Sequence, residues 1–153
     1  MQAEKILVKC IKKKKFFWFI LAENEYIIIS AHYDHLGEDP DTGDIYNGAD
    51  DNASGTTDVI NLAQHFSQQN KLNPFDRTII FSAFAAEEIG GYGSQYLSST
   101  LNPNKVVAMI NIEMIGKPSK FGSGTLWMTG IEKSSLGKIF NKTLNENNKR
   151  IYA

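Results

Sequence analysis

The sequence is poor in several features that would place it in common classes of protein. It has one cysteine, Cys10, so no internal disulfide can form, although this does not identify its compartment. Its apolar run at residues 16–22 is far shorter than the roughly 20 residues that span a bilayer. It also lacks an excess of positive charge, because 16 basic residues are balanced by 17 acidic ones. We therefore expect neither a membrane span nor general nucleic-acid binding.

What the sequence does contain is typical of one soluble domain. It has 153 residues, of which 42% are hydrophobic and 22% charged, enough to bury a core. Near the N-terminus, four lysines at residues 12–15 precede the apolar run, which gives the outline of a signal peptide. Polar residues 23–25 then lead directly into a second apolar run, so we interpret residues 16–22 as a buried strand or hairpin partner.

The hydrophobic pattern predicts strands and helices in alternation. Apolar, β-branched runs are typical of buried strands, and apolar residues three and four positions apart are typical of one helix face. We expect strands at residues 26–30, 78–84, 105–112 and 125–129. We expect helices from residue 54 onward, at 93–99 and at 134–147, with a loop over 37–55. In the second helix we expect Tyr92, Tyr96 and Leu97 to face inward. The apolar side chains of the other two helices each share one face: Val59, Leu62, Ala63 and Phe66 in the first, and Leu136, Ile139, Phe140 and Leu144 in the last.

This alternation predicts an α/β fold, a three-layer sandwich with a central mixed, mostly parallel sheet flanked by helices. In such folds, ligands bind beyond the carboxyl ends of the strands. Ionisable side chains follow the first three strands at this end, and the loop before the first helix adds two acids. They are His32, Asp34, His35, Asp50, Asp51, Glu87, Glu88 and Glu113. We therefore expect one cluster of histidines and carboxylates at a single edge of the sheet.

Imidazole and carboxylate are ligands suited to Zn²⁺ and related divalent ions. Several converging carboxylates would repel one another unless cations lie among them. The segments 30–37, 48–55 and 83–91 contain no lysine or arginine, so a metal ion is the simplest neutralising group.

Taken singly, each residue also has an ordinary structural explanation. A histidine such as His32 can belong to the core, and acids at a helix start can cap it or favour its dipole. We assign His35 and Tyr33 to loop packing and His65 to a solvent-facing position. Glu113, however, lies between two apolar residues, where a buried carboxylate without a partner would be costly.

Four segments within residues 26–116 resemble, in order, the motifs of the MH-clan zinc aminopeptidases. That family includes bacterial leucyl aminopeptidases and is related to glutamate carboxypeptidase, transferrin receptor and glutaminyl cyclase. The segments are Ala31-His-Tyr-Asp-His-Leu-Gly37, Asn47-Gly-Ala-Asp-Asp-Asn-Ala-Ser-Gly55, Ala86-Glu-Glu-Ile-Gly90 with Gly93-Ser94, and Asn111-Ile-Glu-Met-Ile-Gly116. We expect residues 23–153 to form a partial catalytic domain of this type, and residues 1–22 to match it poorly.

The resemblance implies a set of metal ligands. His32 would bind one zinc ion, Glu88 the other, and Asp50 would bridge the two. Glu113 stands where many members carry aspartate as a further ligand to the histidine-bearing zinc. The resemblance also implies a cis peptide bond between Asp50 and Asp51.

The family resemblance further implies that Asp34 orients His32 and that Glu87 is the general base. The family's fifth ligand is a histidine downstream of the position of Glu113, but all three histidines of this sequence lie upstream. We therefore expect two zinc ions with an incomplete second site, and a chain that is a fragment, a truncated product or a natural short variant.

The expected function is metal-dependent hydrolysis of N-terminal peptide bonds, by an aminopeptidase acting on peptides or peptide-like substrates. Two alternatives stay open: a catalytically impaired metal-binding or interaction domain, and an acyltransferase similar to glutaminyl cyclase. The resemblance favours a secreted or periplasmic protein, and it leaves the oligomeric state undetermined.

Overall fold

The computed structural model describes residues 16–20, 25–146 and 151–152, and the chain divides into two compact units. Unit 1 is Met1–Met114 and unit 2 is Ile115–Ala153. The lysine run at residues 12–15 lies outside the described residues. Unit 1 contains all the residues predicted to form the site, so it is described first.

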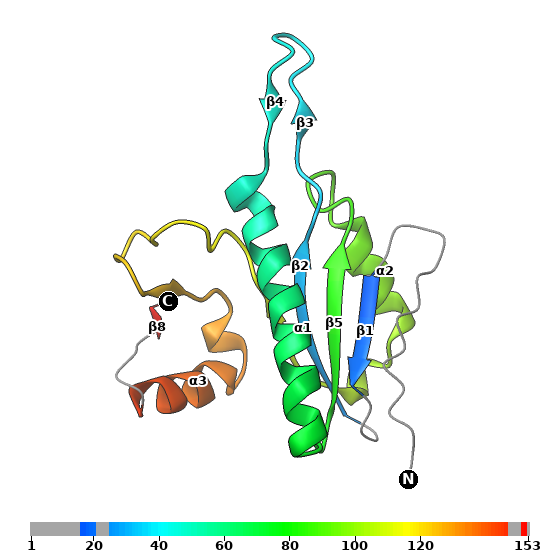
Figure 1. The fold of residues 1–153 in the computed structure, drawn as a ribbon, viewed down its shortest axis with the longest axis vertical. Helices are drawn as coiled ribbons and strands as arrows, with labels where there is room; N and C mark the ends of the chain where they lie inside the picture. Colours follow the sequence, from blue (N-terminus) through cyan, green and yellow to red (C-terminus); the bar gives the residue numbers. More distant parts are fainter. Residues whose placement is uncertain (1–15, 21–24, 147–150, 153) are drawn as a thin grey trace. The chain divides into compact units, whose positions relative to one another are not determined.

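A four-stranded sheet is the centre of unit 1 (Figure 1). Its strands lie in the order β1 (Phe16–Ile20), β5 (Thr78–Phe84), β2 (Tyr26–His32) and β6 (Val106–Asn111). β2 is parallel to both β5 and β6, whereas β1 is antiparallel to β5. The mixed, mostly parallel sheet and the three main strands are thus confirmed, and residues 16–20 do form a strand.

Helices cover both faces of the sheet, which explains why β2 and β5 are apolar almost without interruption (Figure 1). Because successive side chains of a strand point to opposite faces, each strand contributes side chains to two cores, one on each face of the sheet. The core beneath α1 (Gly55–Leu72) consists of Ile29, Ala31, Val59, Ala63, Ile79 and Phe81. The core beneath α2 (Tyr92–Thr100) consists of Ile28, Ile80, Phe84 and Leu97.

The inward face of α1 is as predicted, but that of α2 is not. Leu97 is buried, whereas Tyr92 and Tyr96 are 61% and 56% exposed. The residue one turn before Leu97 on the inward face is Gly93, where a Cβ would lie 2.6 Å from the carbonyl oxygen of Ala85. α2 therefore approaches the end of β5 too closely for a tyrosine to face the sheet.

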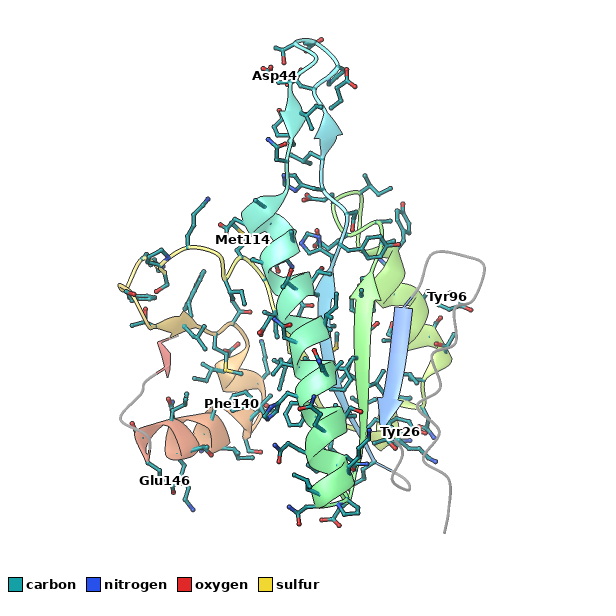
Figure 2. All side chains as sticks on the ribbon, viewed as in Figure 1. Tyr26, Asp44, Tyr96, Met114, Phe140 and Glu146 are labelled. Carbon is teal, nitrogen blue, oxygen red and sulfur yellow. The ribbon has the colours of Figure 1, made fainter. Side chains whose placement is uncertain are left out.

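A short hairpin interrupts the segment predicted as a loop. β3 (Gly37–Glu38) pairs antiparallel with β4 (Ile45–Tyr46), and Asp44 lies at its outer end (Figure 2). The backbone N–H groups of Thr42 and Asp41 donate to the carboxylate of Asp39 and hold its pKa below the usual range.

Unit 2 contains less regular structure than predicted. The fourth strand is limited to β7 (Leu126–Trp127), which pairs parallel with β8 (Ile151–Tyr152). The last helix is α3 (Leu136–Asn145), preceded by the 3-10 turn η3 (Ile131–Lys133). Ile139, predicted to lie on the apolar face of this helix, is 56% exposed. Gly137 is the buried residue of this helix, because it packs against the side chain of Ile131. None of the described helices is both long and apolar enough to cross a membrane.

Candidate metal centre

The carboxyl ends of the parallel strands bring histidines and carboxylates together, as predicted. Tyr26 marks the start of β2 in Figure 2, and Met114, just beyond β6, lies toward the opposite end of the sheet. At that end, three overlapping groups of side chains each place their nitrogen or oxygen ligand atoms within 4.8 Å of one another. The groups are His32, Asp51 and Glu113; His32, Glu87 and Glu88; and His35, Asp51 and Glu88.

His32 is the buried centre of the cluster, with 1% of its surface exposed. Its Nδ1 lies 3.0 Å from the main-chain oxygen of Asp34, to which it donates, and this leaves a lone pair on Nε2. The Nε2 atom lies 3.0 Å from Oδ1 of Asp51 and 4.0 Å from Oε1 of Glu113. Both Nε2 of His32 and Oδ1 of Asp51 are buried and lack a hydrogen-bond partner. Two buried acceptor atoms therefore face each other at short range.

A divalent cation fits this arrangement. Buried polar atoms are almost always paired, and a cation between two acceptors would satisfy both. Zinc binds imidazole nitrogen and carboxylate oxygen at about 2.0–2.2 Å, so ligands of one ion lie up to about 4 Å apart. Within the part of the chain that the structure describes, no lysine or arginine pairs with Asp51, Glu87, Glu88 or Glu113. The donor set thus has the chemistry and the spacing of a metal site.

The structure corrects the prediction for Asp50. It is Asp51, not Asp50, whose carboxylate lies in the cluster, and the cis peptide bond joins Asp51 to Asn52. The segment η1 (Ala49–Ser54) is kinked at Asp51 and Asn52, whose backbone dihedral angles are not helical, so Asp50 and Asp51 do not follow one regular turn. Oδ1 of Asp51 faces His32, and Oδ2 lies 4.0 Å from Nδ1 of His35.

Asn52 links this turn to the end of β6. Its side chain is buried, and its amide nitrogen donates to the carbonyl of Ile112 at 3.0 Å. Its amide oxygen accepts from the backbone N–H groups of Gly55 at 3.1 Å and Met114 at 3.2 Å. Gly55 is required here, because a Cβ would lie 2.4 Å from the carbonyl oxygen of Ile112. Asn52 and Gly55 thereby hold Asp51 opposite Glu113, which lies just beyond the end of β6.

Replacing Asn52 by alanine should therefore destabilise unit 1. The change leaves backbone groups unpaired in a buried place, and each such group costs about 1–3 kcal/mol. We expect the free energy of unfolding to fall by about 2–4 kcal/mol, measured by urea denaturation. The control is Asn61→Ala on the exposed side of α1, which should change stability little. An equal effect of the two changes would contradict the role given to Asn52.

A tight turn presents Glu87 and Glu88. β5 ends at Phe84, and the N–H groups of Gly90 and Gly91 donate to the carbonyl of Glu87 at 3.0 and 2.9 Å. The backbone N–H of Glu88 donates to Oδ2 of Asp34 at 3.3 Å, which joins this turn to the segment after β2. The side chain of Glu87 is exposed and forms no hydrogen bond or ion pair within the described residues. The side chain of Glu88, in contrast, is 17% exposed and points at His35.

Asp34 contacts His32, but not in the way predicted. Its main-chain oxygen accepts from the ring, while the carboxylate oxygen Oδ1 lies 3.8 Å from Nδ1, beyond hydrogen-bond range. The carboxylate turns instead toward the backbone of Glu88. Asp34 thus fixes the ring of His32 through the main chain and the position of Glu88 through the side chain.

Comparison with known proteins bears directly on this centre. The model of peptidase family M28 matches residues 19–152, which include every residue of the cluster. The chain belongs to peptidase family M28. Membership confirms the predicted resemblance to zinc aminopeptidases, and the structure confirms the predicted class of fold.

Several M28-like relatives carry informative names. A "Probable zinc metalloprotease" of Pyrenophora tritici-repentis is 37% identical over 105 residues, which are 67% of this chain and 23% of that protein. "Aminopeptidase YwaD" of Bacillus subtilis is 32% identical over 95 residues, covering 60% of this chain and 18% of that protein. A solved structure, "Aminopeptidase from Aneurinibacillus sp. strain AM-1", matches with a TM-score of 0.54 and 26% identity, over 65% of this chain and 24% of that one. The chain therefore spans less than a quarter of these relatives.

The roles of three residues at this site differ from those expected from the sequence. The sequence places Asp51 in the cluster, but the resemblance gives the bridging role to its neighbour Asp50. Asn52 supports Asp51 through hydrogen bonds to the segment beyond β6. His35 was assigned to loop packing, yet its Nδ1 lies 2.8 Å from Oε1 of Glu88. The available signal for His35 was its spacing: it lies three residues after His32, in the same segment beyond β2.

Proposed function

We propose that this chain carries the metal-binding half of a two-zinc peptidase site that hydrolyses N-terminal peptide bonds. The observation that carries the proposal is the facing pair of buried, unpartnered atoms, Nε2 of His32 and Oδ1 of Asp51. His32, Asp51 and Glu113 would hold one ion, and Asp51 and Glu88 would contribute to the other. The names of the relatives support zinc as the metal and an exposed peptide amino end as the substrate feature.

The chain's own residues provide the remaining chemistry. When bound, the ions would polarise the scissile carbonyl and lower the pKa of the attacking water. Glu87 is suited to the general base, because its carboxylate lies beside His32 and Glu88 yet has no partner of its own. It would accept the proton of the attacking water and return it to the leaving amine. Asp34 and Asn52 would hold the ligand side chains in position through their hydrogen bonds.

An assay of aminoacyl-anilide hydrolysis tests this proposal. We expect the zinc-loaded chain to release the anilide from substrates with a free amino group and to spare N-acetylated ones. A chelator should abolish release, and added Zn²⁺ should restore it. Release that survives chelation would contradict a metal mechanism, and no release by a folded, zinc-loaded chain would contradict the proposed hydrolysis by this chain. Ring closure of an N-terminal glutaminyl peptide, without cleavage, would favour the acyltransferase alternative.

A further inference from the structure

Two pairs of polar side chains follow one another where β2 lies beside β6. Ser30 and Asn111 are register partners in the parallel ladder, which continues as the N–H of Ile112 donates to the carbonyl of Ser30 at 2.7 Å. His32 and Glu113 come two positions later along each segment, and side chains two positions apart on a strand point to the same face. The second pair contributes ligand atoms to the proposed centre, whereas the first pair contributes none.

The hydroxyl of Ser30 is buried and is used by Asn111. It lies 2.9 Å from the amide oxygen Oδ1 and donates to it, and the serine is 0% exposed. Three isoleucines precede Ser30 in β2, so a buried hydroxyl would be costly there without this bond. The bond fixes the orientation of the amide: its oxygen points to β2, and its nitrogen is left to donate elsewhere.

The amide nitrogen of Asn111 faces Glu113. Nδ2 lies 3.5 Å from the carboxylate oxygen Oε2, at the long end of hydrogen-bond range. The reverse orientation of the amide would place its oxygen against the carboxylate, which is repulsive. The other carboxylate oxygen, Oε1, lies 4.0 Å from Nε2 of His32. The contact with Asn111 therefore distinguishes two otherwise equivalent oxygens and leaves Oε1 for the ion.

Glu113 depends on such a contact more than the other acidic ligands of the proposed centre. Its side chain is 47% exposed, compared with 32% for Asp51 and 17% for Glu88. An exposed glutamate samples several rotamers, and ordering it has an entropic cost. A ligand that is oriented before the ion arrives avoids that cost during binding.

We propose that Asn111 is a positioning residue of the metal centre, which orients the carboxylate of Glu113 and is itself oriented by Ser30. The inference rests on the proposed metal-dependent function and adds two residues that support one of its ligands. Loss of a hydrogen-bond partner of a metal ligand typically weakens metal binding by about 10- to 100-fold. The competing explanation is that Ser30 and Asn111 only join β2 to β6, so that their loss would lower stability and leave metal binding by the folded chain unchanged.

Asn111→Leu separates the two explanations, because leucine is similar in size but can neither donate nor accept a hydrogen bond. Co²⁺ alone serves as the probe, titrated into the metal-free chain and followed by visible absorption, which depends on the arrangement of the ligand atoms. We expect the binding of one Co²⁺ ion to weaken by about 10-fold or more and its absorption bands to change. Asn104→Leu is the matched control, since Asn104 is exposed just before the start of β6, and it should change neither property.

Ser30→Ala provides a second variant, and circular dichroism confirms that each variant is folded. Alone, it should weaken Co²⁺ binding, because the amide of Asn111 is no longer oriented. Added to Asn111→Leu, it should restore stability by removing an unpaired buried hydroxyl, but it should not restore affinity.

The outcomes that contradict the inference are distinct from those that contradict the function. Unchanged Co²⁺ affinity and absorption in folded Asn111→Leu would overturn the role of Asn111. A further loss of affinity when Ser30→Ala is added to Asn111→Leu would show that Ser30 does not act through Asn111. A folded wild-type chain that binds no Co²⁺ would instead overturn the proposed function itself.

Discussion

Glu87→Gln should leave the metal content of the chain unchanged and lower the turnover of aminoacyl anilides by about 100- to 10,000-fold. Glutamine has nearly the shape of glutamate but cannot accept the proton of the attacking water. Of the His32, Glu87 and Glu88 group, Glu87 has an exposed side chain that pairs with none of the residues described by the structure. Its replacement should therefore disturb neither the fold nor the ligands.

The prediction is checked by measuring turnover and bound zinc on the same preparation. Glu38→Gln is the matched control, since Glu38 is also exposed but lies on the β3–β4 hairpin. It should retain both activity and metal. Full activity of Glu87→Gln would remove Glu87 from the mechanism, and loss of zinc from that variant would make Glu87 a ligand instead of a base.

The fold was largely predictable because its signals are local. β2 and β5 are apolar, β-branched runs, and the spacing of Val59, Leu62, Ala63 and Phe66 on α1 matches one helix face. Elements of this kind, alternating along the chain, leave few arrangements besides a mostly parallel sheet between helices. That arrangement in turn places the residues that follow each strand at one edge.

The errors have a different physical origin, because they depend on contacts between distant segments. Tyr92 and Tyr96 are predicted inward from their apolar character, but Gly93, which lies close to Ala85, and Leu97 are the buried residues of α2. The choice between Asp50 and Asp51 depends on the backbone of η1, which Asn52 fixes through the end of β6. Hydrogen bonds of this kind span about 60 residues of sequence and leave no periodic signal.

His35 illustrates the same difficulty on the scale of one side chain. A histidine in a polar loop most often packs locally, and its three-residue separation from His32 is too general to indicate a place in the cluster. Its significance depends on Glu88, which lies 53 positions away in the sequence and 2.8 Å away in space. Only the turn after β5 brings the two side chains together.

Asp51→Asn should remove both metal ions, whereas Asp50→Asn should retain them. The two oxygens of Asp51 face the two imidazoles, so its carboxylate is shared by both proposed ion sites. Asparagine keeps the shape of the side chain but loses its negative charge, and neutral amides are weak ligands for zinc. We expect zinc per chain to fall from two ions to nearly none, and turnover to fall by more than about 100-fold.

Because the residues are adjacent and chemically identical, each variant controls for the other. Zinc is measured by elemental analysis after dialysis, and circular dichroism confirms that both variants are folded. Removing one of several crowded carboxylates should, if anything, relieve repulsion in the metal-free chain, so lower metal content cannot be attributed to unfolding. If Asp50→Asn lost the metal and Asp51→Asn kept it, the cluster around Asp51 would not be the metal centre, and the roles of His32 and Glu113 that depend on it would have to be abandoned.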